Sequence, residues 1–302
     1  MTHDNTFDVI IVGGSYSGLA AAMALGRALK KVLVIDSGKP CNRQTPYSHN
    51  FITHDGDSPA GIAALANLQV RKYNTVNFFD GLATKGSGTK KGFEILVASG
   101  ETFAAKKLIF ATGIRDIMPA IDGFEACWGI SVLHCPYCHG YEVRYEKTGI
   151  LGNGESAFEL ATLISNWTND LTLLTNGAPT LTTEQTVQLK KRRIKLIEKK
   201  VTKVEQKNGH IENIIFQDGS KSGMKIIYAP VPFEQHCTIP ESFGCELTEE
   251  GYIKIDPLQE TTVKGIYACG DNVTRMRTLA NAVAMGTAAG ISVSKKLIYE
   301  EF

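Results

Sequence analysis

Two cysteines separated by two residues form the most reactive pattern in the sequence. Cys135 and Cys138 lie between His134 and His139. One turn of helix can hold both sulfur atoms together, and Pro136 suits the first helical position, where its missing N–H costs nothing. Cys135 would then lie near the positive end of a helix, which favours its thiolate. The flanking histidines could hold or supply a proton, so the pattern indicates thiol–disulfide exchange.

Length and composition bound the kinds of protein that can carry this pair. The 302 residues are 43% hydrophobic, which supports two domains with real cores. A net charge of +1 gives no reason to expect nucleic acid as a partner. No apolar run reaches the roughly 18 residues of a membrane-spanning helix, and the stretch 279–293 reads as a buried core helix. The odd count of seven cysteines and the lack of a visible signal peptide predict a reducing cytoplasm.

A unit of strand, glycine turn, helix and strand occurs twice. The first copy has the turn GGSYSG and ends at Asp36, and the second has the turn GNGESA and ends at Thr175. Gly13 to Asp36 spans 23 residues, and Gly152 to Thr175 again spans 23. Two matching turns at equal spacing indicate two βαβ units that bind dinucleotides.

Each turn has the small residues that a pyrophosphate site needs. Such residues let backbone N–H groups approach a phosphate at a helix N-terminus. Asp36 can also accept hydrogen bonds from a ribose diol, whereas Thr175 cannot. The alternative is an α/β fold with glycine turns and no nucleotide. Positions one, three and six are Gly13, Ser15 and Gly18 in the first turn and Gly152, Gly154 and Ala157 in the second.

The order of the remaining segments places the second unit inside the first domain. After a long turn-rich loop, an apolar strand ends at Thr112 and Gly113, and another near the end of the chain is closed by Gly270 and Asp271. Ordered loops of this length are often functional. We therefore expect an α/β fold with two Rossmann-like dinucleotide-binding domains, the first formed by residues 1–114 and 244–302 and the inserted second by residues 115–243.

These segments together resemble the low-molecular-weight thioredoxin reductase-like flavoproteins. The resemblance covers nearly the whole chain and rests on GGSYSG with Asp36, ATG at 111–113, CPYCHG at 135–140, GNGESA at 152–157 and ACGD at 268–271. It implies a cytoplasmic homodimer whose first domain binds FAD. The inserted domain would bind NADPH and carry the cysteine pair.

The resemblance also implies residue roles. Cys138 would face the flavin and take its electrons, and Cys135 would attack the substrate disulfide. Most thioredoxin reductases have Asp after the second cysteine as a general acid; His139 can do that work with a pKa nearer 7, unless it is a solvent-facing turn residue. No metal is expected. The implied FAD residues are Gly13, Ser15, Tyr16, Ser17, Gly18, Asp36, Asn42, Arg43, Gln44, His49, Asn50, Thr112, Gly113, Gly270, Asp271, Thr278 and Leu279, and those for a nicotinamide nucleotide are Gly152, Gly154, Glu155 and Ser156.

Other interpretations of the cysteine pair are weaker. A zinc site usually draws on a second cluster, and only Cys237 with His236 is a candidate. A structural disulfide does not suit a reducing compartment. CPYC alone looks like a glutaredoxin active site, but that small fold would not contain two dinucleotide units. Cys41 lies in the long loop, and we expect the others to be small buried apolar residues: Cys127, Cys237, Cys245 and Cys269.

The electron donor is not indicated by any one residue. NADPH-dependent members of the family carry a basic cluster just after the second strand of the inserted unit, to pair with the 2′-phosphate. Here Thr175 is followed by Asn176, Gly177 and Ala178. The basic run 190–193 is expected at the C-terminal end of the next helix, where cations complement the dipole. NADPH and NADH therefore both stay open.

Three functions fit these features. In the first, which we favour, NAD(P)H reduces FAD, FAD reduces the dithiol, and the dithiol reduces a thioredoxin-like protein or a small disulfide. In the second, a small dithiol substrate is oxidised and oxygen reoxidises the flavin; the chain resembles fungal and bacterial dithiol oxidases at His139 and at Asn176-Gly177. Other divergent relatives take electrons from ferredoxin. The third is a redox-sensing binding module without turnover, which the intact dithiol and FAD motifs argue against.

Overall fold

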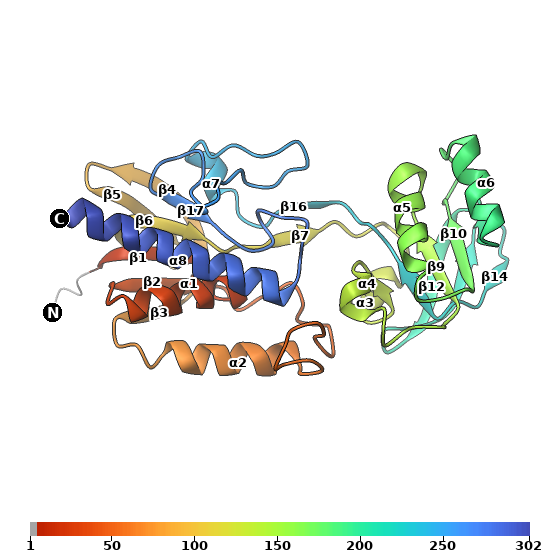
Figure 1. Cartoon of the computed structure of the whole chain (residues 1–302), viewed down its shortest axis with the longest axis horizontal. Coiled ribbons are helices and arrows are strands. Elements are labelled where there is room, and N and C mark those ends of the chain that lie inside the picture. The colour runs from red at the N-terminus through yellow and green to blue at the C-terminus, as the bar shows by residue number, and fades with distance from the viewer. Residues whose placement is uncertain (1–4) are drawn as a thin grey trace. The chain divides into compact units, whose positions relative to one another are not determined.

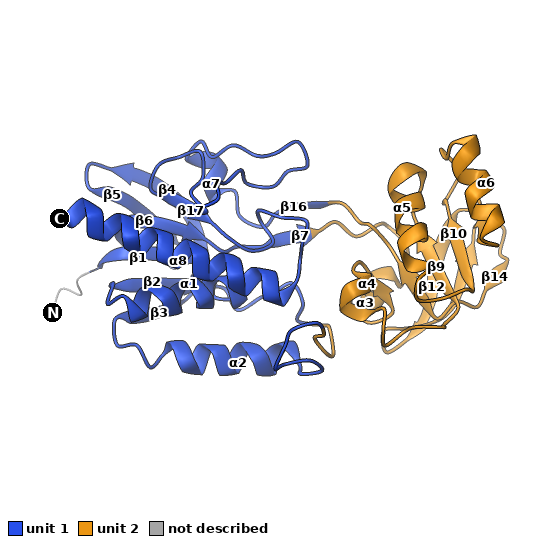
Figure 2. Cartoon of the chain, in the orientation of Figure 1, with its two compact units in different colours: residues 1–43, 50–115, 233–302 blue, residues 44–49, 116–232 orange. Residues whose placement is uncertain are grey.

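The computed structural model describes residues 5–302, which form two compact units (Figure 2). Unit 1 contains the residues up to Arg43 together with 50–115 and 233–302, and unit 2 contains 44–49 and 116–232. Unit 2 thus interrupts unit 1 in the sequence. Its last residue is Pro232 rather than Phe243, because Ile239 and Phe243 pack in the apolar core of unit 1.

A seven-stranded sheet forms the centre of unit 1 (Figure 1). Its strands are β1 (Thr6–Val12), β2 (Val32–Asp36), β3 (Val76–Asp80), β4 (Ala83–Thr89), β5 (Gly92–Val97), β6 (Thr102–Phe110) and β17 (Ile266–Ala268). The order is β3-β2-β1-β6-β5-β4, and β17 also pairs with β6. The strands β1, β2, β3, β6 and β17 run parallel, whereas β4, β5 and β6 form an antiparallel meander.

Helices cover this sheet because its central strand is apolar on both faces. Along β1, Val9 and Ile11 join the core beneath the helices, and Ile10 joins the core on the opposite face, as the alternation of a strand requires. A Cβ on Gly286 would lie 2.0 Å from the backbone oxygen of Ser17, so a small residue lets the last helix approach the first. The helices are α1 (Tyr16–Arg27), α2 (Pro59–Val70), α7 (Ile239–Ser242) and α8 (Leu279–Glu301).

Unit 2 has a five-stranded parallel sheet and a separate antiparallel one. The order in the parallel sheet is β11 (Lys195–Ile197), β10 (Leu171–Leu174), β9 (Thr148–Leu151), β15 (Ile226–Tyr228) and β8 (Val132–Leu133). The antiparallel sheet contains β12 (Val201–Lys207), β13 (His210–Phe216) and β14 (Lys221–Ser222). The helices are α3 (Phe124–Cys127), α4 (Pro136–His139), α5 (Gly154–Ile164) and α6 (Thr183–Lys191).

The α/β class with Rossmann-like parallel sheets is confirmed. The two chain segments that connect the units pair with each other as β7 (Ile114–Asp116) and β16 (Phe233–Gln235). The expected helix at 279–293 is the first part of α8, and α2 was not anticipated; Ser58 caps α2 by accepting a hydrogen bond from the N–H of Gly61. Within residues 5–302, no helix has both the length and the apolar character needed to cross a bilayer.

Candidate redox site and nucleotide-binding turns

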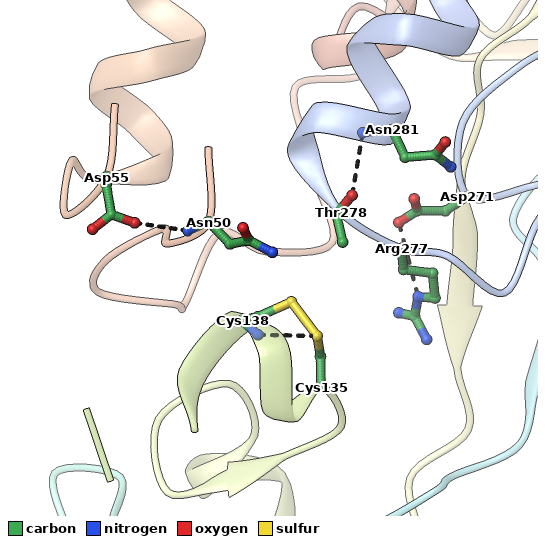
Figure 3. Close-up of a disulfide and its surroundings, with 8 residues drawn as sticks. All are labelled: Asn50, Asp55, Cys135, Cys138, Asp271, Arg277, Thr278 and Asn281. Carbon is green, nitrogen blue, oxygen red and sulfur yellow. Dashed lines mark hydrogen bonds and ion pairs between the residues drawn. A yellow bond between two sulfur atoms is a disulfide. The ribbon is translucent and has the colours of Figure 1, made fainter. Parts of the chain in front are cut away.

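Cys135 and Cys138 are joined by a disulfide at the start of α4 (Figure 3). Cys135 is the N-cap of this helix and Pro136 is its first residue, as the sequence predicts. The backbone N–H of Cys138 donates a hydrogen bond to the Cys135 sulfur over 3.2 Å. A donor at this place favours negative charge on the sulfur. After reduction, Cys135 is therefore the cysteine whose thiolate the helix stabilises.

His139, the last residue of α4, lies in a cluster with His49. The two rings are 6.4 Å apart, centre to centre, and nearly perpendicular at 87°. Burial, and after it the proximity of His49, lowers the pKa of His139 to about 4. The imidazole of His139 is therefore neutral at pH 7, so it can accept a proton but has none to donate as an acid.

A carboxylate completes this cluster. The Nδ1 atom of His49 is 3.5 Å from Oε1 of Glu142. The resemblance implies an FAD role for Gln44 and His49; the segment 44–49 belongs to unit 2, where His49 lies beside the redox helix. The other flanking histidine, His134, stacks on Trp128 with ring centres 5.9 Å apart. The two histidines beside the cysteines thus have different surroundings.

In the first glycine turn, between β1 and α1, backbone segments approach so closely that there is no room for a side chain at Gly13 or Gly18. Gly13 has φ +105°, and a Cβ added there would lie 2.3 Å from the backbone oxygen of Ala111. A Cβ on Gly18 would lie 1.9 Å from the oxygen of Gly13. Ser15 is the N-cap of α1, but its side chain makes no cap hydrogen bond, and the first turn of the helix holds no acid. The N-terminus of α1 is therefore open to an anion such as a pyrophosphate.

Asp36 lies beside this turn at the end of β2. Its Oδ1 accepts a hydrogen bond from the N–H of Gly14 over 3.0 Å. A Cβ on Gly14 would lie 2.8 Å from the Asp36 Cβ. Gly14 was not predicted as a site residue from the sequence, although the double glycine at 13–14 was a visible signal. Asp36 thus has the position that a ribose-binding acid needs, at the carboxyl end of a parallel strand.

Further candidate residues follow β6 and β17 at the same edge of the sheet. The amide of Asn272 donates to the backbone oxygen of Phe110 over 2.9 Å and to Thr112 Oγ1 over 3.3 Å. Its Oδ1 is buried and has no hydrogen-bond partner among residues 5–302. Asp271 lies 3.8 Å from Arg277 (Figure 3). Asn272 and Arg277 were not predicted from the sequence, where their closeness to Gly270 and Asp271 was the signal available.

The remaining FAD candidates have structural partners in unit 1. The hydroxyl of Tyr16 donates to the backbone oxygen of Pro59 over 3.0 Å and lies 3.4 Å from the amide of Asn42. Thr278 caps α8 by accepting from the N–H of Asn281 (Figure 3). Three other candidates have backbone roles or positions: Arg43 donates to Pro40, the N–H of Asn50 donates to Asp55, and Leu279 is the first residue of α8.

The second glycine turn, between β9 and α5, is closed by the chain itself. Asn153 caps α5: its Oδ1 accepts from the N–H groups of Gly154, over 2.9 Å, and Thr180, over 2.8 Å. Its Nδ2 donates to the backbone oxygen of Ala178 over 2.8 Å. The acidic Glu155 occupies the first helical turn and accepts from the side chain of Gln185. The N-terminus of α5 therefore has a side-chain cap and an acid in its first helical turn, and the N-terminus of α1 has neither.

The residues directly after β10 use their side chains for hydrogen bonds that stabilise the backbone around them. The hydroxyl of Thr175 donates to the backbone oxygen of Gly177 over 2.6 Å, and Asn176 Oδ1 accepts from the N–H of Val201 over 2.8 Å. Asn176 has φ +54°. Lys190 and Lys191 lie in the last turn of α6, as predicted. A basic cluster for a 2′-phosphate is thus absent from the residues directly after β10.

The other cysteines differ in burial. Cys127, Cys245 and Cys269 are buried, as expected, and burial raises the pKa of each thiol. Cys237 is only half-buried, so the prediction of a fully buried residue was wrong there; it lies at the edge of the unit 1 core. Cys41 is exposed in the long loop.

Comparison with known proteins gives full-length matches. Residues 7–286 match the family described as pyridine nucleotide-disulphide oxidoreductase. Thioredoxin reductase tcpT of Claviceps purpurea is 31% identical over 99% of this chain and 96% of its own length. Thioredoxin reductase aclD of Aspergillus oryzae is 30% identical over 98% of both. The crystal structure of an oxidoreductase from Agrobacterium tumefaciens superposes with a TM-score of 0.91 at 33% identity, covering 97% of this chain and 99% of that one.

Proposed function

The chain belongs to the pyridine nucleotide-disulphide oxidoreductase family, and we propose that it exchanges a disulfide at Cys135 and Cys138 with a thioredoxin-like protein. It is an oxidoreductase of the thioredoxin reductase-like type, and FAD is the cofactor. The exchange proposal depends on the hydrogen bond from the backbone N–H of Cys138 to the Cys135 sulfur at the start of α4, which stabilises a Cys135 thiolate. The neutral His139 follows Cys138 directly.

The exchange uses both sulfur atoms and one proton acceptor. In the reducing direction, the Cys135 thiolate attacks a sulfur of the partner disulfide; that disulfide breaks, and a mixed disulfide forms. Cys138 attacks the Cys135 sulfur, which releases the second partner sulfur, and His139 passes the proton of Cys138 on to that leaving sulfur, because an imidazole with a pKa of about 4 does not keep it. Two electrons pass to the partner, whose two sulfur atoms leave as thiols with the proton from Cys138 and one from solvent. The Cys135–Cys138 disulfide is the product.

Unit 1 has the features that an FAD site requires. We assign the pyrophosphate to the open turn of Gly13, Ser15 and Gly18, and the ribose to Asp36. The buried Oδ1 of Asn272 can accept a hydrogen bond from the cofactor. These groups surround the carboxyl ends of β1, β2 and β6, where the strand order reverses and α/β proteins bind ligands. Bound FAD supplies a two-electron carrier that can restore either the dithiol or the disulfide.

A second function, oxidation of a dithiol with oxygen as the acceptor, is favoured by the closed second turn. The Asn153 cap and the carboxylate of Glu155 oppose a bound pyrophosphate, since that anion is best held where the N-terminal N–H groups of the helix are uncapped and the first helical turn has no acid. The loop after Thr175 adds no cation. A chain with this turn needs a source or acceptor of electrons other than a pyridine nucleotide.

Anaerobic mixing tests both proposals. Purified holoprotein is mixed in turn with NADPH, NADH, a reduced thioredoxin and a small dithiol, and the visible flavin absorbance is followed. Bleaching by NADPH or NADH supports the reductase and overturns the reasoning from the closed turn. Bleaching only by dithiols, reversed by admitting oxygen, supports the oxidase. Failure of every reagent to bleach the flavin would contradict exchange at Cys135 and Cys138 altogether.

We place the chain in the cytoplasm as a homodimer. An apolar groove of about 490 Å³ runs over α1, α2 and α8 in unit 1, with Leu65 and Ile291 exposed along it. A patch of this kind is typical of an interface between copies of one chain. Leu65→Lys should shift the protein from dimer to monomer in analytical ultracentrifugation. A wild-type monomer at micromolar concentration would contradict the proposal.

A further inference from the structure

A row of polar side chains leads from the redox helix toward the surface of unit 2. His139 follows Cys138 directly, and its ring lies 6.4 Å from the ring of His49, centre to centre. Nδ1 of His49 is in turn 3.5 Å from Oε1 of Glu142. The His49 side chain is 17% exposed and that of Glu142 is 37% exposed, so water reaches the carboxylate more readily than the imidazole. The row therefore connects the cysteine pair with solvent.

Tyr228 on β15 adds a buried donor that senses the charge of Glu142. It is 1% exposed, and its hydroxyl has no hydrogen-bond partner among residues 5–302. Burial, and after it the charge of Glu142, raises the pKa of Tyr228, so the phenol stays protonated. A buried hydroxyl that lacks a protein partner is ordinarily satisfied by water. The surroundings of Glu142 thus suit an ordered water, as a chain of proton transfers requires.

The exchange at Cys135 leaves one proton to be supplied from outside the pair. One of the two protons that leave with the partner comes from Cys138, and the other comes from solvent. His139 adjoins the reacting sulfur atoms, but its imidazole has a pKa of about 4 and stores no proton at pH 7. A proton that reaches the two histidines therefore rests on His49, next to the carboxylate.

We propose that Glu142 and His49 form a proton relay that carries the solvent proton to His139. The inference rests on the proposed function and adds two residues that act through His139. Glu142 takes a proton from water and passes it to Nδ1 of His49, which releases the proton on its other ring nitrogen. One water molecule spans the gap between the rings.

His139 then gives this proton to the first sulfur that leaves the partner as the mixed disulfide forms. No electrons move along the relay, because the two electrons pass from sulfur to sulfur. When a dithiol is oxidised instead, the proton travels outward by the same path. The groups that border the relay are the two cysteines and Tyr228, whereas Arg144 lies over the Tyr141 ring and His134 stacks on Trp128.

The test varies whether the leaving sulfur needs a proton. Full-length holoprotein carrying Cys41→Ser, which removes the exposed thiol outside the pair, is reduced, freed of reductant and mixed anaerobically with one of two disulfides. The aromatic thiolate of 5,5′-dithiobis(2-nitrobenzoate) leaves without a proton, whereas the more basic alkyl thiolate of bis(2-hydroxyethyl) disulfide leaves faster when it is protonated. Both react with the same Cys135 thiolate, so the ratio of their rate constants reports proton supply.

We expect Glu142→Gln and His49→Asn each to lower the ratio of the alkyl to the aromatic rate constant about tenfold or more at pH 8, because a positioned proton donor contributes at least that much. The deficit should shrink at pH 6, where free protons are more abundant. Added imidazole buffer should restore the alkyl rate constant, since it delivers protons without the relay. Glu146→Gln is the matched control: it removes an exposed carboxylate four residues further along and should leave the ratio unchanged.

An unchanged ratio in either relay variant overturns the relay but leaves the exchange function standing. Equal slowing of both disulfides, or slowing that imidazole does not relieve, shows that the substitution disturbs the site rather than its proton supply, which also overturns the inference. Failure of the reduced protein with both relay residues intact to react with either disulfide refutes the proposed function itself.

Discussion

The protonation state of His139 offers the sharpest test of the redox site. The unfolded chain should titrate this histidine near 6.5, whereas burial and His49 lower its folded pKa to about 4. Between these values the unfolded chain binds more protons, so folding stability rises with pH. The folding stability that depends on a neutral His139 is fully present above pH 6.5, decreases as the pH falls below 6.5, and is lost as the pH falls through about 4. Replacement by Asn, which stays neutral, should remove this pH dependence.

The size of the effect follows from the two pKa values. The difference between 6.5 and about 4, at 1.36 kcal/mol per pH unit, corresponds to about 3 kcal/mol of acid-induced destabilisation. His49 acts on His139 directly, Glu142 lies 3.5 Å from His49, and Glu142 in turn acts on Tyr228. Burial and then Glu142 raise the pKa of Tyr228, so that phenol stays neutral throughout this range. His49→Asn should move the pKa of His139 part of the way back toward its ordinary value, because it removes the smaller of the two causes that lower this pKa, the electrostatic influence of His49.

The assay is an NMR titration of the histidine ring carbons in the oxidised holoprotein, with the His139 signal assigned by its loss in His139→Asn. Melting temperatures of both proteins between pH 4.5 and 7.5 give the stability effect, and His54→Asn, which removes a surface histidine paired with Asp57, is the control. A His139 midpoint between 6 and 7 would refute the buried, neutral imidazole. Equal acid sensitivity of wild type and His139→Asn would refute the stability argument.

Three other predictions concern the sulfur atoms and the first turn. Cys135→Ser and Cys138→Ser should each retain FAD yet lose disulfide turnover, measured by flavin content and by reaction with thioredoxin; full activity in either contradicts the exchange step. Asp36→Ala removes the acceptor for the N–H of Gly14 and the proposed ribose contact, so it should lower flavin content at least tenfold after gel filtration, while circular dichroism stays unchanged. Gly18→Val places a side chain 1.9 Å from the oxygen of Gly13 and should cost about 3 kcal/mol or more, seen as a fall in melting temperature; an unchanged midpoint would show that the turn is not tight.

Local sequence patterns predicted much of the fold because they act over a few residues. Glycines between an apolar strand and a helix located both turns, and Pro136 located the start of α4. The residues at which unit 2 begins and ends were harder to predict from the sequence. Ile239 and Phe243 look like any apolar residues of a loop, and only the core that they join assigns them to unit 1.

The two glycine turns likewise show how far the local sequence predicts a binding site. Equal spacing made them look equivalent, yet the first is open and the second is closed by Asn153 and Thr180. Those two residues are 27 positions apart, and their hydrogen bond exists only because the loop after β10 folds back on the turn. A sequence motif specifies a backbone shape but not which groups later occupy it.

Residue types and their spacing were enough to predict the chemistry: a helix-capping dithiol, two βαβ units and the family that combines them. How that chemistry is tuned depends on contacts between distant segments. The tertiary structure brings His49 to His139 across 90 positions of chain, withdraws water from the ring and so keeps it uncharged. Residue types fix which atoms can react, but pKa values and open binding sites depend on neighbours and on excluded water, which packing of distant segments supplies.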